Sequence, residues 1–429
     1  MLKNILGTAG TRILNAIITF VLLFIITHNL GSKGMGTIGL ILLDINIIQM
    51  FIDLFAGSAL IFMASRTSLA NLLFISYTWI VVIIVFFAAL FGIAGNLFPE
   101  VYHTVVPQGY EMHILVLTTI SAYMLTHYNL LLGKERIKAF NVFFTIQAFT
   151  LFMVFAYLIF IKEKKSVLSY VTALYASYSI SMIISFIAVL FKEKNLRLYN
   201  LTEVAKEVFN FGFVTSVANF LHVGNKRIGY YIIRFFTGLS SLGIYTAGTQ
   251  LTEGLKLIGQ SISLVQFTTL SNSTDKLYAK NLTIKLMKVS VLLTFLALIV
   301  LFIIPVSVYV FFFGPEFEQV KLVIIFLSPG VIALSANTIF AHFFSGMGNP
   351  KINLYSNAIG FFVVVIIALL LIPVYGFYGA AVAVSISYLI SMVYNFTVFK
   401  NQTGTLLKEL IPKAGDMVEF RSLLKSLKK

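Results

Sequence analysis

Apolar stretches of about 20 residues recur along the whole chain, separated by short polar segments. Each stretch is long enough to cross the roughly 30 Å hydrocarbon layer of a bilayer as a helix. The stretches lack the alternation of apolar and polar residues that membrane β-strands show. The pattern therefore predicts membrane-spanning α-helices. We expect twelve of them, at residues 8–30, 37–63, 72–95, 113–133, 140–161, 167–191, 210–235, 244–270, 286–311, 320–345, 352–372 and 377–399.

The composition excludes a single water-soluble domain. Of the 429 residues 59% are hydrophobic and 11% are charged, whereas soluble domains average about 25% charged residues. The net charge of +15 would suit a nucleic-acid-binding protein, but the basic residues lie mostly in the short segments between apolar stretches. We therefore expect a multi-pass membrane protein with no nucleic-acid partner.

Metal and thiol chemistry have no support in the sequence. There is no cysteine, and the six histidines are not spaced as metal ligands. We expect no metal, no cofactor and no catalytic residue. The first apolar stretch lacks a small-residue cleavage site, so we interpret it as the first span and not as a removed signal peptide.

The distribution of lysine and arginine predicts the orientation. These residues are much more frequent in the set of alternate loops that includes both ends of the chain than in the other set. Because cytoplasmic loops carry the excess of positive charge, both termini should be cytoplasmic. The run Lys162–Lys165 is the exception.

An internal repeat predicts two related halves. Gly31 and Gly36, in the segment LGSKGMG, recur 207 residues later as Gly238 and Gly243, in TGLSSLG. An even number of spans per repeat gives two six-helix lobes of the same topology, related by a pseudo-two-fold axis along the membrane normal, with a central cavity between them. A chance match of glycine-rich loops is the alternative. The expected parts are an N-terminal lobe at 1–191, a cytoplasmic linker at 192–209, a C-terminal lobe at 210–399 and a basic cytoplasmic tail at 400–429.

Polar residues follow one face of four expected helices. The first span carries Thr8, Arg12, Asn15 and Thr19, and the positions 207 residues later are Thr215, Asn219, His222 and Lys226. The second span carries Asn46, Gln49 and Asp53, and the matching positions are Glu253, Lys256 and Gln260. The spacing places each set on one side of its helix. These stripes share the offset of the loop glycines, which favours a true repeat.

The stripes predict a hydrated cavity that binds an anion. An ionisable group at bilayer depth costs about 2.5–3.5 kcal/mol, so it normally faces a cavity or a partner. The basic members outnumber the acidic ones, and arginine and lysine are suited to phosphate oxygens. The candidate substrate-binding residues are Arg12, Asn15, Asn46, Gln49, Asp53, Asn219, His222, Lys226, Arg227, Arg234, Glu253, Lys256 and Gln260.

A purely structural role is the alternative for these residues. Glu253 and Lys256 are three residues apart and could pair on one helix, and Arg12 could extend to the cytoplasmic interface. A role of His222 in ion coupling is the weaker interpretation of that residue.

Several segments resemble one known family. They are LGSKGMG, DLFAGSALIFMASR (53–66), FGPEFEQ (313–319), FFSGMGNPK (343–351) and LIPVYGFYGAAVAVSISY (371–388). In order and spacing they resemble the polysaccharide or O-antigen (Wzx-type) flippases of the multidrug/oligosaccharidyl-lipid/polysaccharide exporter superfamily. The chain departs from the fourteen spans usual in the peptidoglycan-precursor flippases.

The resemblance implies a transporter of a bacterial or archaeal cytoplasmic membrane. Its substrate would be a polyprenyl-pyrophosphate-linked oligosaccharide, flipped from the cytoplasmic to the outer leaflet by alternating access for surface polysaccharide biosynthesis. The implied partners are this lipid-linked oligosaccharide, membrane lipids, polysaccharide assembly proteins and a coupling ion, H⁺ or Na⁺.

Two other functions stay open. A cation-coupled multidrug antiporter of the same superfamily would use the carboxylates Asp53 and Glu253. A membrane glycan polymerase or glycosyltransferase would need a sizeable loop domain or converging acid and base groups. The longest outer loop, at about 96–112, offers only Glu100, His103 and Glu111. We therefore expect a transporter and not an enzyme.

Overall fold

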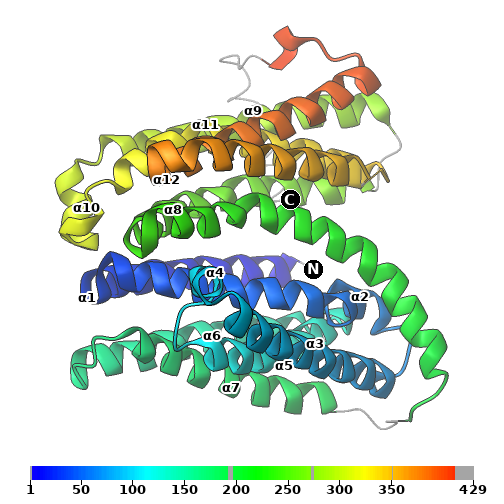
Figure 1. Cartoon of the computed structure of the whole chain (residues 1–429). Helices are drawn as coiled ribbons and strands as arrows, with labels where there is room; N and C mark the ends of the chain where they lie inside the picture. Colours follow the sequence, from blue (N-terminus) through cyan, green and yellow to red (C-terminus); the bar gives the residue numbers. More distant parts are fainter. Residues whose placement is uncertain (1, 192–196, 272–274, 350, 411–429) are drawn as a thin grey trace. The chain divides into compact units, whose positions relative to one another are not determined.

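The computed structural model describes residues 2–191, 197–271, 275–349 and 351–410, and the regular elements in these ranges are all helical (Figure 1). The chain divides into two compact units. Unit 1 comprises Met1–Phe220 with Gly238–Gly243, and unit 2 comprises Leu221–Thr237 with Ile244–Lys429.

Nine long helices make up most of the chain. They are α1 (Leu2–Ala56), α3 (Leu69–Leu97), α5 (Glu111–Gly133), α6 (Ile137–Ala156), α7 (Val167–Leu190), α8 (Leu201–Ser271), α9 (Lys276–Ile303), α11 (Val320–Gly346) and α12 (Lys351–Thr403). Short helices and turns connect them: α2 (Ser58–Met63), α4 (Pro99–Val105), η1 (Tyr157–Ile161), α10 (Val306–Phe313), η2 (Pro315–Phe317) and η3 (Leu407–Leu410).

The three longest helices are each broken at one glycine. Gly31 in α1 has φ 65°, Gly238 in α8 has φ 90° and Gly376 in α12 has φ 59°. Glycine adopts positive φ readily because it has no Cβ. The breaks divide nine long helices into twelve long segments within the described ranges, which confirms the predicted all-α fold. The prediction of loops after the first and seventh spans was wrong, because one glycine changes the direction of the chain and the helix resumes at the next residue.

The repeated glycines contact each other inside unit 1. A Cβ atom on Gly36 would collide with the carbonyl oxygen of Leu239, and one on Gly243 would collide with that of Ser32. The Ser32 and Ser240 hydroxyls are hydrogen-bonded. The contacts are reciprocal, and glycine is required at both positions because the two backbones leave no space for a side chain.

Small polar side chains join the helices within each unit. In unit 1, Ser76 Oγ donates to the Phe55 carbonyl at 3.1 Å and Asn129 Nδ2 donates to the Ala56 carbonyl at 3.0 Å. In unit 2, Asn395 Nδ2 donates to Asn337 Oδ1 at 2.7 Å. Such bonds and the close approach of small residues stabilise helix packing where apolar burial alone gives little preference for protein over lipid.

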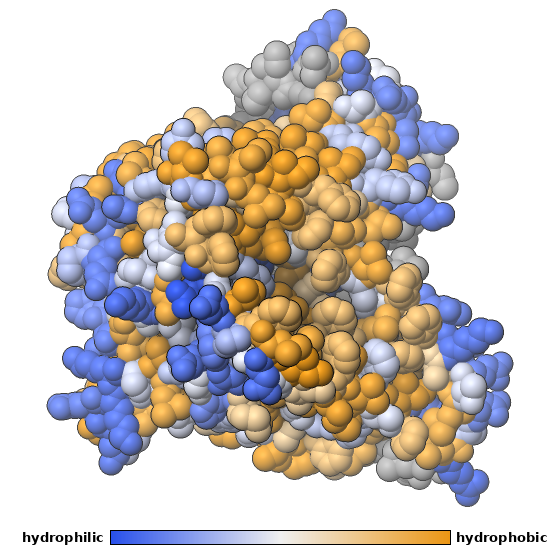
Figure 2. All heavy atoms as spheres, viewed as in Figure 1, coloured by the Kyte–Doolittle hydropathy of each residue, from blue (hydrophilic) through white to orange (hydrophobic). Residues whose placement is uncertain are grey.

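The outer surface is suited to a bilayer. In the described residues, eight helical stretches are long and apolar enough to cross a membrane. Only 17% of the most apolar part of Leu69–Leu97 is buried, and 11% of that of Ile137–Ile161, so these helices present apolar side chains outward. Hydrophobic residues dominate the visible face, with hydrophilic residues gathered mainly toward its two sides (Figure 2). The chain is therefore a multi-pass membrane protein, and α8 is the least apolar of its long helices.

Candidate functional site

The strongest candidate site is a group of charged residues on the two limbs of α8 that belong to unit 2, on either side of its break. Lys226 and Arg227 precede the break at Gly238, and Glu253 follows it. Lys226 Nζ lies 3.2 Å from Glu253 Oε1. Arg227 Nη2 lies 3.0 Å from Glu253 Oε1 and 3.3 Å from Oε2. The break at Gly238 thus allows two cations and a carboxylate from distant parts of one helix to meet.

Buried aromatic residues support Arg227 from behind. Its guanidinium donates a hydrogen bond to the Tyr230 hydroxyl, and its central carbon lies 4.8 Å from the centre of the Tyr230 ring. The Tyr230 hydroxyl also lies 2.8 Å from Thr249 Oγ1 on the second limb of α8. Tyr230 is almost fully buried and packs edge-to-face on Tyr245. Arg227 is therefore held on two sides.

Lys256 adds a third cation to the cluster. It lies three residues after Glu253, and its Nζ is 5.6 Å from the centre of the Tyr388 ring on α12. This is within the range of a cation–π interaction. Within the described ranges, Lys256 pairs with no carboxylate. We call Lys226, Arg227, Glu253 and Lys256 the basic cluster, and its formal charges leave two net positive charges.

The basic cluster is partly accessible. The exposed fractions of the side chains are 21% for Lys226, 24% for Arg227 and 30% for Glu253. The charged groups are therefore partly exposed at the surface of the protein, while Tyr230 beside Arg227 is buried. Positive charges in such surroundings interact more strongly with an anion than they would in bulk water.

A hydrogen-bonded node anchors α8 beside the cluster. Asn225 Oδ1 accepts a bond of 2.6 Å from Ser387 Oγ on α12, and the same hydroxyl lies 2.9 Å from the Gly360 carbonyl. A Cβ atom on Gly360 would be only 2.5 Å from Asn225 Nδ2. The node fixes the position of the helix turn that carries Lys226.

Of the other predicted residues of unit 2, His222 lies close enough to Lys226, Glu253 and Lys256 to interact with them electrostatically. His222 is exposed one helical turn before Lys226, and Gln260 is exposed one turn after Lys256. Arg234 is partly buried, and its Nε atom has no hydrogen-bond partner in the described part of the protein. A role of these three residues in binding stays a prediction.

The predicted residues of unit 1 form a weaker group. Gln49 Nε2 donates to Asp53 Oδ1 at 2.8 Å, and Asp53 is in no ion pair in the described part of unit 1. Asn15 is buried with both its side-chain oxygen and nitrogen unpaired there. Asn46 donates to the Leu42 carbonyl at 2.7 Å. Arg12 and Asn219 are exposed. The cavity expected between the two halves stays a prediction.

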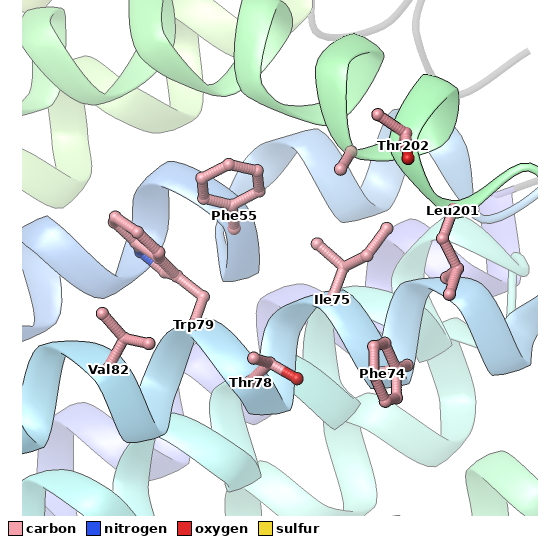
Figure 3. Close-up of a pocket in the computed structure, with 9 residues that line it drawn as sticks. Phe55, Phe74, Ile75, Thr78, Trp79, Val82, Leu201 and Thr202 are labelled. Atoms are coloured by element: carbon pink, nitrogen blue, oxygen red, sulfur yellow. The ribbon is translucent and has the colours of Figure 1, made fainter.

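A separate hollow in unit 1 is apolar. It has a volume of about 390 Å³ and is lined by Phe55, Phe74, Ile75, Thr78, Trp79, Val82, Leu201, Thr202 and Ala205. The rings of Phe55 and Trp79 lie on one side of it (Figure 3). The Trp79 indole nitrogen already donates to the Phe51 carbonyl at 3.0 Å. The lining contains no charged side chain, so this hollow is not suited to an anionic group.

Sequence reasoning identified the charged members of the cluster and missed their supports. Tyr230, Thr249 and Asn225 are close in sequence to predicted residues, and their polar groups inside apolar spans were a usable signal. Tyr388 and Ser387 lie far along the chain, and the pattern of one helix does not indicate them. The pairing of Glu253 with Lys256 that was considered as an alternative is not formed as an ion pair, because Glu253 bonds Lys226 and Arg227 instead.

Sequence comparisons give two distant relatives. No family model matches the sequence. An uncharacterized membrane protein of Methanocaldococcus jannaschii is 26% identical over 200 residues, which cover 45% of this chain and 39% of the relative. The capsular polysaccharide biosynthesis protein CapF of Staphylococcus aureus is 24% identical over 230 residues, which cover 52% and 58%. The matched segments span less than two thirds of either relative.

Solved structures show the fold. The lipid II flippase MurJ in an inward closed conformation matches with a TM-score of 0.72 and 16% identity, over 96% of this chain and 89% of that one. An inward-facing multidrug resistance MATE family transporter of the MOP superfamily matches with a TM-score of 0.78 and 11% identity, over 91% and 94%. The chain therefore has the two-lobe, all-helical fold found in MOP superfamily transporters, as predicted.

Proposed function

We propose that this protein is a transporter that flips a polyprenyl-pyrophosphate-linked oligosaccharide from the cytoplasmic to the outer leaflet by alternating access. The observation that carries the proposal is the basic cluster, in which three cations and one carboxylate meet inside a membrane protein. Charged residues within the membrane-spanning part of a protein are costly and mark a functional site or a pathway.

The chemistry of the cluster suits a pyrophosphate. This group has several negatively charged oxygens, which accept parallel hydrogen bonds from an arginine fork and attract lysine as a point charge. The net charge of the cluster matches a ligand with at least two negative charges. The neutral residues Asn15, Asn46, Gln49, Asn219 and Gln260 are proposed to contact the sugars, because amides can both donate to and accept from hydroxyl groups.

The similar proteins support this reading. One similar structure is a lipid II flippase and one relative is a capsular polysaccharide biosynthesis protein. Both names fit transport in the assembly of a surface saccharide. The cytoplasmic position of both termini, a coupling ion and contacts with polysaccharide assembly proteins belong to the same proposal.

A cation-coupled multidrug antiporter is the second candidate, because MATE transporters share the fold. Such an antiporter needs a carboxylate that can bind a cation. Of the two predicted site carboxylates, Glu253 is already neutralised by Lys226 and Arg227, which leaves Asp53 for this role. The excess of positive charge in unit 2 makes the antiporter the weaker proposal.

Replacement of the lysines tests the proposed function. The full-length protein is reconstituted in liposomes with a fluorescent polyprenyl-pyrophosphate-linked saccharide, and flipping is followed by quenching from outside. We expect Lys226→Ala and Lys256→Ala each to slow flipping by more than about tenfold, because loss of an ionic contact worth about 1.4 kcal/mol or more changes binding by that factor.

The matched control is Lys280→Ala. Lys280 forms a second lysine–glutamate pair in the described part of unit 2, with Glu409 at 3.1 Å, at a distance in sequence from the cluster. This control should flip at the wild-type rate. Wild-type flipping by both cluster variants would refute the assignment of the basic cluster to the ligand.

A further inference from the structure

Glu253 occupies the position that an anionic ligand would take in the basic cluster. Its Oε1 atom is shared by Lys226 Nζ at 3.2 Å and Arg227 Nη2 at 3.0 Å, and its Oε2 atom lies 3.3 Å from the same Arg227 nitrogen. A phosphate group binds lysine and arginine with the same kind of contacts. The carboxylate therefore satisfies the donors that the proposed ligand needs.

We propose that Glu253 is an internal anion that fills the basic cluster when it is empty and is displaced by the pyrophosphate of the ligand. This inference rests on the proposed function and adds the mechanism by which the site binds and releases its ligand. In the exchange, the pyrophosphate oxygens replace the carboxylate at Lys226 and Arg227, and Glu253 turns away.

The charges explain why the empty cluster needs an internal anion. Without Glu253, three cations would lie near one another with no counter-ion, and unpaired charges in poorly hydrated surroundings are strongly destabilising. With Glu253 in place, two of the three cations are paired. Lys256 stays without a carboxylate partner in the described ranges, so the cluster retains attraction for an incoming anion.

The geometry explains why the exchange leaves the site intact. Arg227 is held independently by the Tyr230 hydroxyl, which in turn is bonded to Thr249. Asn225, which precedes Lys226, is fixed to Ser387 on α12. When Glu253 leaves, these contacts keep both cations in position. Glu253 is the most exposed of the three ion-paired side chains, so it has room to move.

The exchange has a consequence for transport. A carrier must bind its ligand firmly enough to capture it and weakly enough to release it. A carboxylate that competes for the same donors lowers the apparent affinity, because the ligand binds only the fraction of molecules in which the site is free. The return of Glu253 then assists release.

Binding of inorganic pyrophosphate tests the exchange. The full-length protein is purified in nanodiscs of neutral lipid, and the Kd is measured by calorimetry without divalent cations. We expect Glu253→Gln to bind pyrophosphate at least about tenfold more tightly than wild type. This factor corresponds to a wild-type site that Glu253 leaves unoccupied in about a tenth of the molecules. Glu409→Gln removes a glutamate that pairs with Lys280, outside the cluster, and should bind as wild type does.

Thermal stability gives a second measurement on the same samples. Glu253→Gln should have a lower Tm than wild type without an anion, and pyrophosphate should raise its Tm by more than it raises that of wild type. If Glu253→Gln is too unstable to purify, Glu253→Asp keeps the charge on a shorter side chain that reaches the cations less well. This variant should bind pyrophosphate with a Kd between those of wild type and the glutamine variant.

The outcomes separate this inference from the proposed function. Equal or weaker binding of pyrophosphate by Glu253→Gln and Glu253→Asp would overturn the exchange and show that Glu253 only positions the cations. In that case, loss of flipping by Lys226→Ala would still support the flippase. If flipping does not depend on Lys226 or Lys256, the proposed function fails, whatever the glutamate variants bind.

Discussion

Arg227 shows how a single residue of the cluster is prepared for its ligand. Its guanidinium is bonded to Glu253 on one side and to Tyr230 on the other, and only the first of these contacts is proposed to break. The Tyr230 hydroxyl thereby becomes a positioning group for the arginine. Its effect on binding can be separated from its effect on stability.

We expect Tyr230→Phe to weaken pyrophosphate binding and to lower stability by about 1.5–3 kcal/mol, the value of a hydrogen bond to a charged group. The matched control is Tyr309→Phe, which removes a buried hydroxyl that donates to the Leu301 carbonyl at 2.7 Å. Both variants should lose stability in thermal unfolding, and only Tyr230→Phe should raise the Kd for pyrophosphate. Equal Kd values for the two variants would show that the hydroxyl does not position Arg227.

At the residue scale, the sequence predicted which charges lie within spans and could not predict their pairs. The helical spacing places Glu253 and Lys256 on one face, and a local pair was a reasonable expectation. The break at Gly238 instead brings Lys226 and Arg227 to the carboxylate. Which residues of the two limbs of α8 pair depends on the backbone angles at Gly238. The spacing of residues along the sequence does not indicate those angles.

At the scale of elements, the repeated glycines have different tasks. Gly238 has φ 90°, and no neighbouring atom lies within 4 Å of the position that a Cβ atom would take. Glycine is therefore required at this position for the backbone conformation. Gly36 and Gly243 pack against backbone atoms, so glycine is required at these positions because there is no space for a Cβ atom. The offset of 207 residues relates two pairs of glycines, and the structure assigns a separate physical reason to each pair.

This difference predicts unequal costs for alanine. Gly238→Ala should lower stability by about 1–2 kcal/mol, the cost of a left-handed conformation for a residue with a Cβ. Gly36→Ala should cost more, because backbone atoms of another helix would have to move. Gly92→Ala in α3 is the control, since nothing lies within 4 Å of its Cβ position. Thermal unfolding in one lipid compares the three, and a smaller loss for Gly36→Ala than for Gly238→Ala would contradict this account.

The elements themselves were largely predictable. Apolar length located the spans outside α8, because a bilayer imposes the same thickness on every helix. The connections were less predictable: the expected loops at 31–36 and 238–243 are helical after one residue. A glycine-rich segment indicates a change of direction, but it does not show whether the change needs one residue or several.

At the scale of the whole molecule, the two candidate functions share one fold, so the fold does not distinguish them. They differ in the sign of the charge that the binding site needs. A flippase for a pyrophosphate-linked lipid needs a net positive binding site, and a drug antiporter needs a site that accepts a cation. The basic cluster has two net positive charges. Asp53, the carboxylate left for a cation, is bonded to Gln49.

We therefore expect the wild-type protein to bind pyrophosphate and to show no saturable binding of the lipophilic cation tetraphenylphosphonium below millimolar concentration, because the basic cluster repels it. Calorimetry on the full chain in nanodiscs measures both ligands. The Lys226→Ala, Lys256→Ala double variant removes two positive charges, and it should lose pyrophosphate binding. Cation binding that persists in this double variant and disappears in Asp53→Asn would instead establish the antiporter, since it would place the ligand at the carboxylate of unit 1 and leave the basic cluster with a structural role.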